Sequence, residues 1–316
     1  MSRMRRIILA GGSGYLGKIL AGHFTKLGWE VVVLTRHTYG KTNVLFWDGA
    51  TVGDWAAALE DSEAVVNLAG RTVNCRYTPK HQREIYDSRV VPTRTLGAAI
   101  GRCVRPPRVW VNLSSATIYR HALDRPMDEE TGEVGSGFSV DVCEKWEQAL
   151  AQSATPRTRK IALRTAIVLG PGEGGAFAAL HRLVRLGLGG TLGSGKQFVS
   201  WVHALDFARV TEWVVEREEM IGPLNCASPH PVSNADFMRA LREVSHRSIG
   251  LPATRWMLEI GAFFLRTETE LLLKSRRVVP GRLLAAGYKF EFPGLRGALQ
   301  DILDRGATAT SYGSEK

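Results

Sequence analysis

Cysteine and long apolar runs are both scarce in this sequence of 316 residues. No two of its 4 cysteines form a C-x-x-C pair, which argues against a structural zinc site and against a disulfide framework. We therefore expect no metal site, and cysteines that are reduced and mostly buried. The longest strongly apolar stretch, residues 256–265, is too short to span a bilayer and contains Glu259, so no membrane partner is expected. The cysteines are Cys75, Cys103, Cys143 and Cys226.

The sequence also lacks clustered charge of one sign. Its 41 lysines and arginines and 31 aspartates and glutamates give a net charge of +10, but the basic residues are scattered along the chain. No helix-turn-helix, zinc or base-stacking motif accompanies them, which argues against a nucleic-acid partner. The first six residues lead directly into a strand pattern, without the apolar region and cleavage site of a signal peptide. We therefore expect a cytoplasmic protein.

A glycine cluster near the N-terminus is the strongest positive signal. An apolar run at residues 6–10 is followed by three glycines at the spacing G-x-x-G-x-x-G and then by an amphipathic segment, which predicts strand, tight turn and helix. Glycines suit three needs of such a turn: φ values that other residues rarely adopt, a close approach of the backbone to a ligand, and close packing of the helix on the strand. The three glycines are Gly11, Gly14 and Gly17.

The start of the helix that follows, at Tyr15 and Leu16, would direct backbone N–H groups and a positive dipole end toward an anion such as a pyrophosphate. We interpret the cluster as a dinucleotide-binding turn, and the alternative is an ordinary structural turn.

The second predicted strand, residues 29–35, ends without the carboxylate that would bind the ribose 2′-hydroxyl of NAD. The chain reads Thr35-Arg36-His37 at this point. A guanidinium there favours a 2′-phosphate, so the sequence predicts NADP as the cofactor. The alternative is that Arg36 is a solvated loop residue.

Strands and helices alternate through the first half of the chain. This alternation predicts an α/β fold with a Rossmann-type doubly wound parallel sheet. We expect Pro92 to kink or interrupt the long helix at 79–104. Further strands are predicted at 43–47, 64–70, 109–115 and 160–169, and helices at 52–59, 79–104 and 140–151.

Several candidate site residues lie after these strands. The loop at Leu68 and Ala69 could lie along the cofactor, and Glu84 and Arg89 on the long helix either face the cofactor or belong to the surface. The strand at 109–115 ends in two hydroxyls, at the carboxyl edge where open α/β sheets bind ligands. These are Ser114 and Ser115.

The second half of the chain predicts a smaller, mainly helical region on the substrate side. A short strand at 198–202, a helix at 203–216 and a helix at 234–244, capped by Ser233, precede a lid-like helical segment at 251–303. The predicted domains are a dinucleotide-binding domain at 1–170, with 196–216 packing back onto it, a substrate-side region at 171–305 that includes a C-terminal domain at about 250–303, and a loose tail at 306–316.

With these motifs in view, the chain resembles the extended short-chain dehydrogenase/reductases. It resembles most closely their atypical subgroup of NADP-dependent epimerase-family proteins, or nucleoside-diphosphate-sugar epimerase-like proteins, which carry a short C-terminal domain of unknown function. The resemblance extends over almost the whole chain. Besides the glycine cluster, the matching segments include residues 65–70, 88–89, 114–119, 142–147, 186–190, 193–198, 201–206 and 277–280.

The resemblance implies a Ser or Thr that acts with a Tyr-x-x-x-Lys pair, the tyrosine as acid/base and the lysine lowering its pKa. Ser115 matches the serine, but the pair is missing. When Glu147 is used as the anchor, the lysine position holds Cys143 and the tyrosine position holds Ser139. Lys145 lies two residues farther along the helix, a rotation of about 200° that directs it away. The narrower subgroup also lacks the pair.

Two functions follow from these observations. The first is an NADP-dependent oxidoreductase or epimerase that acts on a small or nucleotide-linked substrate, with Ser115 polarising the reacting oxygen and Tyr119 as the nearest candidate to move the proton. The second is an NADP(H)-binding sensor or scaffold that has lost turnover. The sequence leaves the oligomeric state open.

Overall fold

The computed structural model describes residues 4–38, 40, 42–253 and 274–311. Within these residues the main sheet has seven strands in the order β3-β2-β1-β4-β5-β6-β10, and every neighbouring pair is parallel. The strands are β1 (Arg6–Ala10), β2 (Glu30–Thr35), β3 (Val44–Phe46), β4 (Ala64–Asn67), β5 (Val109–Ser115), β6 (Arg159–Thr165) and β10 (Gly222–Cys226). The strand order reverses between β1 and β4, so the predicted doubly wound parallel sheet is confirmed.

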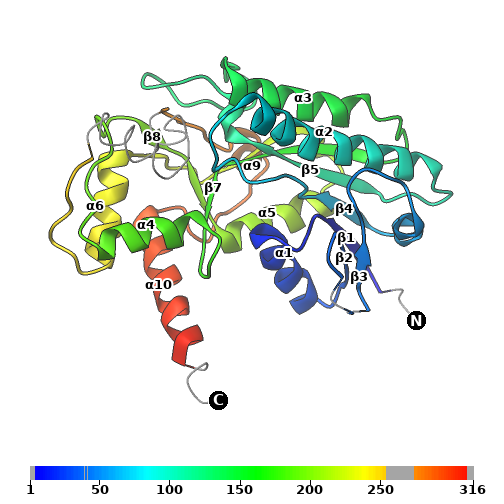
Figure 1. Ribbon diagram of the computed structural model, residues 1–316, viewed down its shortest axis with the longest axis horizontal. Coiled ribbons are helices and arrows are strands. Elements are labelled where there is room, and N and C mark those ends of the chain that lie inside the picture. Colours follow the sequence, from blue (N-terminus) through cyan, green and yellow to red (C-terminus); the bar gives the residue numbers. More distant parts are fainter. Residues whose placement is uncertain (1–3, 39, 41, 254–273, 312–316) are drawn as a thin grey trace.

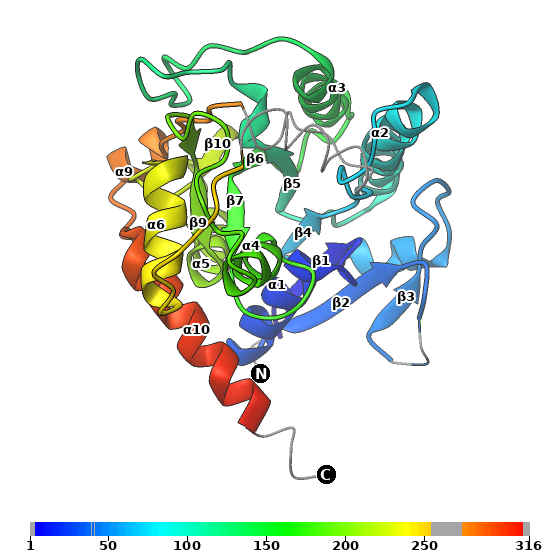
Figure 2. The same ribbon diagram turned by 60° about the vertical axis from the view of Figure 1, so that its left-hand side comes forward.

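Helices cover both faces of this sheet, because the side chains of a strand alternate between its two faces. Ile7 and Leu9 of β1 join a core cluster with Leu20 and Phe207, whereas Ile8 joins another cluster on the opposite face. Helices α1 (Tyr15–Lys26) and α5 (Ala204–Glu216) contribute to the first cluster and α2 (Pro79–Arg102) to the second. Helix α3 (Phe138–Gln152) lies beside α2, across the sheet from α1 and α5 (Figure 2).

A smaller, mainly helical unit lies at one end of the molecule, where α4, α6 and α10 gather (Figure 1). Its apolar cluster includes Phe177, Trp201 and Phe237. Ser233 caps α6 as predicted, because its hydroxyl accepts a hydrogen bond of 3.1 Å from the Asp236 N–H. The helices are α4 (Ala176–Arg185), α6 (Asn234–Val244), α9 (Gly281–Ala285) and α10 (Leu295–Ser311). The short strands are β7 (Ile167–Leu169) with β9 (Trp201–His203), and β8 (Phe198–Val199) with β11 (Val232–Ser233).

Two predicted strands are each divided in two. The Ala166 N–H still bonds to the Cys226 carbonyl of β10 in the main sheet, whereas the Ile167 N–H bonds to the Ser200 carbonyl, so the chain at 160–169 leaves the main sheet between these two residues. The segment 198–202 likewise splits into β8 and β9, which pair with different partners. The sequence prediction also missed β10, which adds an edge strand to the main sheet from beyond residue 170.

Two further expectations need correction. Of the two outcomes expected for Pro92, the interruption is wrong, because Pro92 lies inside the continuous helix α2; the kink stays a prediction. Helix α10 extends to Ser311, so residues 306–311 are helical where a loose tail was expected. The apolar stretch at 256–265 lies outside the described residues. No helix within those residues is both long and apolar enough to cross a membrane.

Candidate functional site

The glycine turn after β1 shows three different uses of glycine. Gly11 has a φ of +74°, and a Cβ there would lie 2.9 Å from the Cα of Ala69. A Cβ on Gly17 would lie 2.1 Å from the Gly12 carbonyl oxygen, so the helix packs closely on the turn. By contrast, no described heavy atom lies within 4 Å of the corresponding position on Gly14. The turn therefore leaves an open backbone surface at Gly14, at the start of α1.

The ends of β2 and β4 flank this surface. The Thr35 hydroxyl donates to the Ser13 hydroxyl at 3.0 Å, which ties the end of β2 to the glycine turn. Arg36 follows and is exposed, and its guanidinium makes no hydrogen bond or ion pair with the part of the chain that the structure describes. The Leu68 N–H donates to the Ala10 carbonyl at 2.8 Å, so the loop at Leu68 and Ala69 runs beside the turn.

The side chains of Tyr15 and Leu16 hold the first turn of α1 against the rest of the protein. Leu16 packs against the core cluster, and the ring of Tyr15 lies beside Gly175, where a Cβ would come within 2.6 Å of it. The Tyr15 hydroxyl is buried and has no hydrogen-bond partner among the described residues. Burial also raises the pKa of Tyr15, so its hydroxyl stays protonated.

These residues fit a phosphorylated dinucleotide. The helix start offers N–H donors, Gly14 leaves room for a pyrophosphate to approach the backbone, and Arg36 adds a cation at the end of β2. No acidic side chain stands at the end of β2 to favour a 2′-hydroxyl.

Glu84 and Arg89 both hold the loop that follows β4. Glu84 forms an ion pair with Arg71. The Arg89 guanidinium donates to the carbonyls of Ile85 at 3.1 Å and Arg71 at 3.2 Å, and lies 5.3 Å from the Trp146 ring centroid. Their contacts within the chain are therefore structural, although Arg89 also lines the cavity described below.

The two serines at the end of β5 have different partners. Ser114 is 4% exposed and donates to a carboxylate oxygen of Glu147 at 2.6 Å. Arg164 holds the same carboxylate through two hydrogen bonds of 2.9 and 2.8 Å. Ser114 thus belongs to a buried polar network, which argues against the expected contact with the cofactor.

Tyr119 belongs to the same network. It is 1% exposed, and its hydroxyl accepts a hydrogen bond from Arg164 at 2.9 Å and donates one to Asn225 at 3.0 Å. Burial raises the pKa of Tyr119. This position argues against the predicted role of Tyr119 in proton transfer. The sequence reading overlooked Arg164, although a charged residue inside an apolar strand pattern is a usable signal.

Ser115, at the end of β5, lies beside Thr117 and Cys143, to which the sequence analysis gave no role. Its hydroxyl oxygen accepts hydrogen bonds from the N–H of Thr117 at 3.2 Å and from the Thr117 hydroxyl at 3.0 Å. The Thr117 hydroxyl oxygen in turn lies 3.4 Å from the sulfur of Cys143. Burial raises the pKa of Cys143, so its thiol stays protonated. The only local signal for Thr117 is its place two residues after a serine, a spacing typical of serine and threonine turns.

A cavity of about 110 Å³ opens beside Ser115. Ser139 and Cys143, which stand at the positions of the missing tyrosine and lysine, both line it, whereas Lys145 is exposed and does not. The polar lining is completed by Thr117 and Arg89, and the apolar lining consists of Val73, Tyr77, Ile85, Phe138, Val142 and Trp146.

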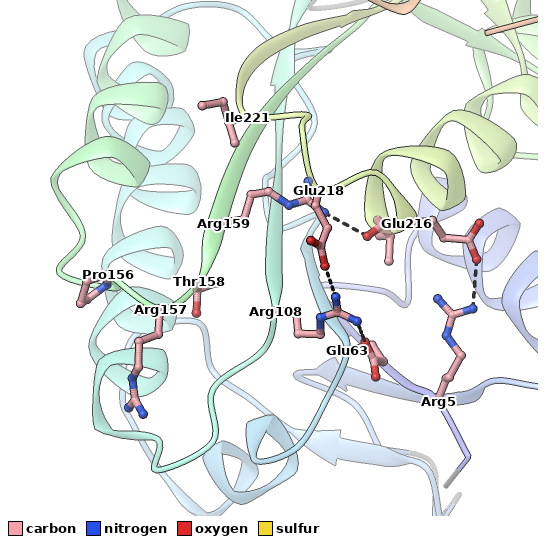
Figure 3. Close-up of a pocket in the computed structure, with 11 residues that line it drawn as sticks. Arg5, Glu63, Arg108, Pro156, Arg157, Thr158, Arg159, Glu216, Glu218 and Ile221 are labelled. Carbon is pink, nitrogen blue, oxygen red and sulfur yellow. Dashed lines mark hydrogen bonds and ion pairs between the residues drawn. The ribbon is translucent and has the colours of Figure 1, made fainter. Parts of the chain in front are cut away.

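Another cavity, of about 580 Å³, lies at the opposite edge of the sheet, near the amino ends of β5 and β6 (Figure 3). Its arginines are already engaged within the chain. Arg5 pairs with Glu216, Arg108 pairs with Glu218, and Arg159 donates to backbone carbonyls. The carboxyl edge, with its open glycine turn, is therefore the better candidate for a ligand site. Within the described residues, no group of three or more histidine, cysteine, aspartate or glutamate side chains could hold a metal ion.

Comparison with known proteins agrees with this geometry. Residues 7–227 match the model of the NAD dependent epimerase/dehydratase family, and residues 253–302 match a domain of unknown function, DUF1731. The epimerase family protein SDR39U1 of Bos taurus is 34% identical over 302 residues, which cover 94% of this chain and 99% of the relative.

Solved structures similar to this chain include one of a human protein and one of a protein from Corynebacterium glutamicum. The crystal structure of human SDR39U1 (isoform 2) with NADPH has a TM-score of 0.85 and 32% identity, and the match covers 95% of this chain and 99% of that one. The nucleoside-diphosphate sugar epimerase from Corynebacterium glutamicum has a TM-score of 0.78 and 26% identity, and the match covers 95% of this chain and 58% of that one. The resemblance inferred from sequence motifs is confirmed. The chain belongs to the NAD dependent epimerase/dehydratase family.

Proposed function

We propose that this protein binds NADP(H) at the carboxyl edge of the main sheet. The observation that carries the proposal is the open backbone surface at Gly14, at the start of α1, together with the Arg36 cation, which has no hydrogen-bond or ion-pair partner among the described residues. The N–H groups of the helix start would bind the pyrophosphate, and Arg36 would bind the 2′-phosphate. The presence of NADPH in the crystal structure of the human relative supports the same cofactor.

The reaction that fits best is that of an oxidoreductase or epimerase in the cytoplasm, acting on a small or nucleotide-linked substrate. Bound NADPH would supply a hydride to a carbonyl carbon while a proton reaches the carbonyl oxygen. Ser115 is the residue that we assign to this oxygen, because its hydroxyl proton is directed away from Thr117. The Corynebacterium relative is described as a nucleoside-diphosphate sugar epimerase, which supports including nucleotide sugars among the candidate substrates.

A catalytically silent NADP(H)-binding protein is the second candidate. Two observations favour it, the small side chains at Ser139 and Cys143 and the engagement of the Tyr119 hydroxyl by Arg164 and Asn225. A positioned general acid or base contributes about 10²- to 10⁴-fold in rate, so its loss would leave slow turnover or none.

One experiment separates the two candidates. NADPH oxidation is measured across a panel of carbonyl compounds and nucleotide sugars, for the unmutated protein and for Ser115→Ala. The enzyme proposal expects turnover that falls at least 10-fold in the variant, because the hydrogen bond to the reacting oxygen is lost, while NADPH affinity stays within about threefold. Turnover that survives the substitution would refute the role of Ser115. Tight NADPH binding with no oxidation above background would favour the silent protein.

A further inference from the structure

The cavity beside Ser115 has the properties of a site for a small acceptor of hydrogen bonds. Both hydrogen bonds from Thr117 end on the Ser115 oxygen, so its two lone pairs are occupied. The Ser115 hydroxyl can therefore act only as a donor. A ligand oxygen that meets it must be an acceptor, as a carbonyl oxygen is.

The groups behind Ser115 strengthen this donor. The Thr117 hydroxyl gives its proton to Ser115, so its oxygen is available to accept the proton of the Cys143 thiol, 3.4 Å away. The order is Cys143 to Thr117 to Ser115, and each donor in such a chain polarises the next. Cys143 and Thr117 are thus positioning residues for the Ser115 proton.

A second hydroxyl faces the same cavity without a partner. The Ser139 hydroxyl oxygen is buried and has no hydrogen-bond partner among the residues that the structure describes. Buried polar groups in native proteins are nearly always satisfied by protein, water or ligand. An oxygen atom bound in this cavity could satisfy Ser139 as well as Ser115.

The remaining walls limit the ligand in size and polarity. The apolar wall includes Ile85 and Val142, and the Phe138 ring is fixed edge-to-face by Tyr77 at 4.7 Å and Tyr86 at 5.5 Å between ring centroids. A dry apolar cavity of about 150 Å³ holds the six heavy atoms of benzene, so about 110 Å³ admits roughly four heavy atoms, such as a carbonyl group and the two carbons attached to it. A pyranose would place several hydroxyls against these apolar side chains without partners.

We propose that this cavity binds the carbonyl end of a small, mainly apolar ketone or aldehyde, and that a sugar ring does not enter it. The proposal rests on the proposed function, because it names the substrate class for the same site. The replacement of the family's tyrosine and lysine by Ser139 and Cys143 is what leaves the space.

Ligand-observed NMR with the NADPH-loaded protein tests this proposal, with cyclopentanone and UDP-glucose as probes. Cyclopentanone is expected to bind in the millimolar range or more tightly and to leave NADPH bound. Ser139→Leu fills the cavity and should weaken cyclopentanone binding at least 10-fold. Gln148→Leu introduces the same leucine at an exposed position of α3 and should leave the binding unchanged. Ser115→Ala, which adds no bulk, should weaken the binding of cyclopentanone about 3- to 10-fold. This variant decides the question if Ser139→Leu does not fold.

The outcomes are distinguishable. If NADPH itself does not bind in calorimetry, the proposed function fails and this inference fails with it. If NADPH binds but cyclopentanone does not, or if its binding is indifferent to Ser139→Leu and Ser115→Ala, only the inference fails. Displacement of cyclopentanone by NADPH would show that the cavity is part of the cofactor site. Saturable binding of UDP-glucose that Ser139→Leu abolishes would also overturn the proposal.

Discussion

Valine at Gly14 should reduce cofactor binding, whereas valine at Gly17 should reduce stability, although the two positions are only three residues apart. Gly14 has a φ of −76° and a ψ of −179°, a conformation open to any residue, and no described atom lies within 4 Å of its Cβ position. Because Gly14 is the N-cap of α1, where valine is less favourable than glycine, Gly14→Val should lower the free energy of unfolding by only about 1 kcal/mol. The new side chain would instead occupy the space through which a pyrophosphate approaches the backbone. Loss of two charge-assisted hydrogen bonds, at about 1.5–3 kcal/mol each, lowers NADPH affinity by roughly 10²- to 10⁴-fold.

At Gly17 the same side chain meets the backbone. Its Cβ would lie 2.1 Å from the Gly12 carbonyl oxygen, so α1 must move away from the turn by about 1 Å, since carbon and oxygen make contact at roughly 3.2–3.4 Å. Overpacking of this kind costs about 3 kcal/mol, which corresponds to a fall in melting temperature of roughly 4–5 °C for a chain of this length.

Calorimetry with NADPH and thermal unfolding of the ligand-free variants measure the two effects separately. Gly14→Val that folds and binds NADPH within threefold of the unmutated protein would refute the assignment of this turn to the pyrophosphate. Gly17→Val with an unchanged melting temperature would refute the packing argument.

Three further predictions concern side chains. Arg36→Ala should reduce the preference for NADPH over NADH by about 10- to 100-fold in calorimetry, and equal affinities of the unmutated protein would exclude the role of Arg36. Tyr119→Phe should lower the free energy of unfolding by about 1–3 kcal/mol, because Arg164 loses a buried partner, and should leave turnover within threefold; a 10-fold loss of turnover at an unchanged melting temperature would restore Tyr119 as the proton donor. Burial lowers the pKa of His203 to about 4, so the unfolded chain, with a histidine pKa near 6.5, takes up the proton first as the pH falls. The free energy of unfolding should therefore fall by about 2 kcal/mol as the pH falls from roughly 6.5 to 5. Urea titrations should show no such fall in His203→Asn, which keeps an acceptor for the Leu205 N–H.

Local patterns were sufficient for the first half of the fold. The turn from Gly11 to Gly17 and the helix after it follow from an apolar run, glycine spacing and a helical period, all of which operate within about 20 residues. Continuous apolar strands indicated a sheet covered on both faces, and the order of strands and helices indicated that it is parallel. The absence of a carboxylate after Thr35 was also visible in the sequence alone, and with it the preference for NADP.

The details of the candidate site depended on contacts between distant segments. Ser114 and Ser115 are adjacent and chemically identical in the sequence, but Ser114 bonds to Glu147, whereas Ser115 bonds to Thr117 and lines the cavity. Tyr119 could be judged only after Asn225, 106 residues away, was seen to accept its proton.

The chain also changes sheets where no local signal marks the change. Thr165 and Ile167 are two residues apart, yet they belong to different sheets, because Thr165 pairs with Cys226 of β10 whereas the Ile167 N–H bonds to the Ser200 carbonyl before β9. The sequence by itself determined the periodicities, the glycine conformations and the charge at the end of β2, because these depend on each residue and its near neighbours. Only the tertiary structure decided which hydroxyl, thiol and carboxylate meet, because the partner of a buried polar group is fixed by the packing of segments far apart in the chain.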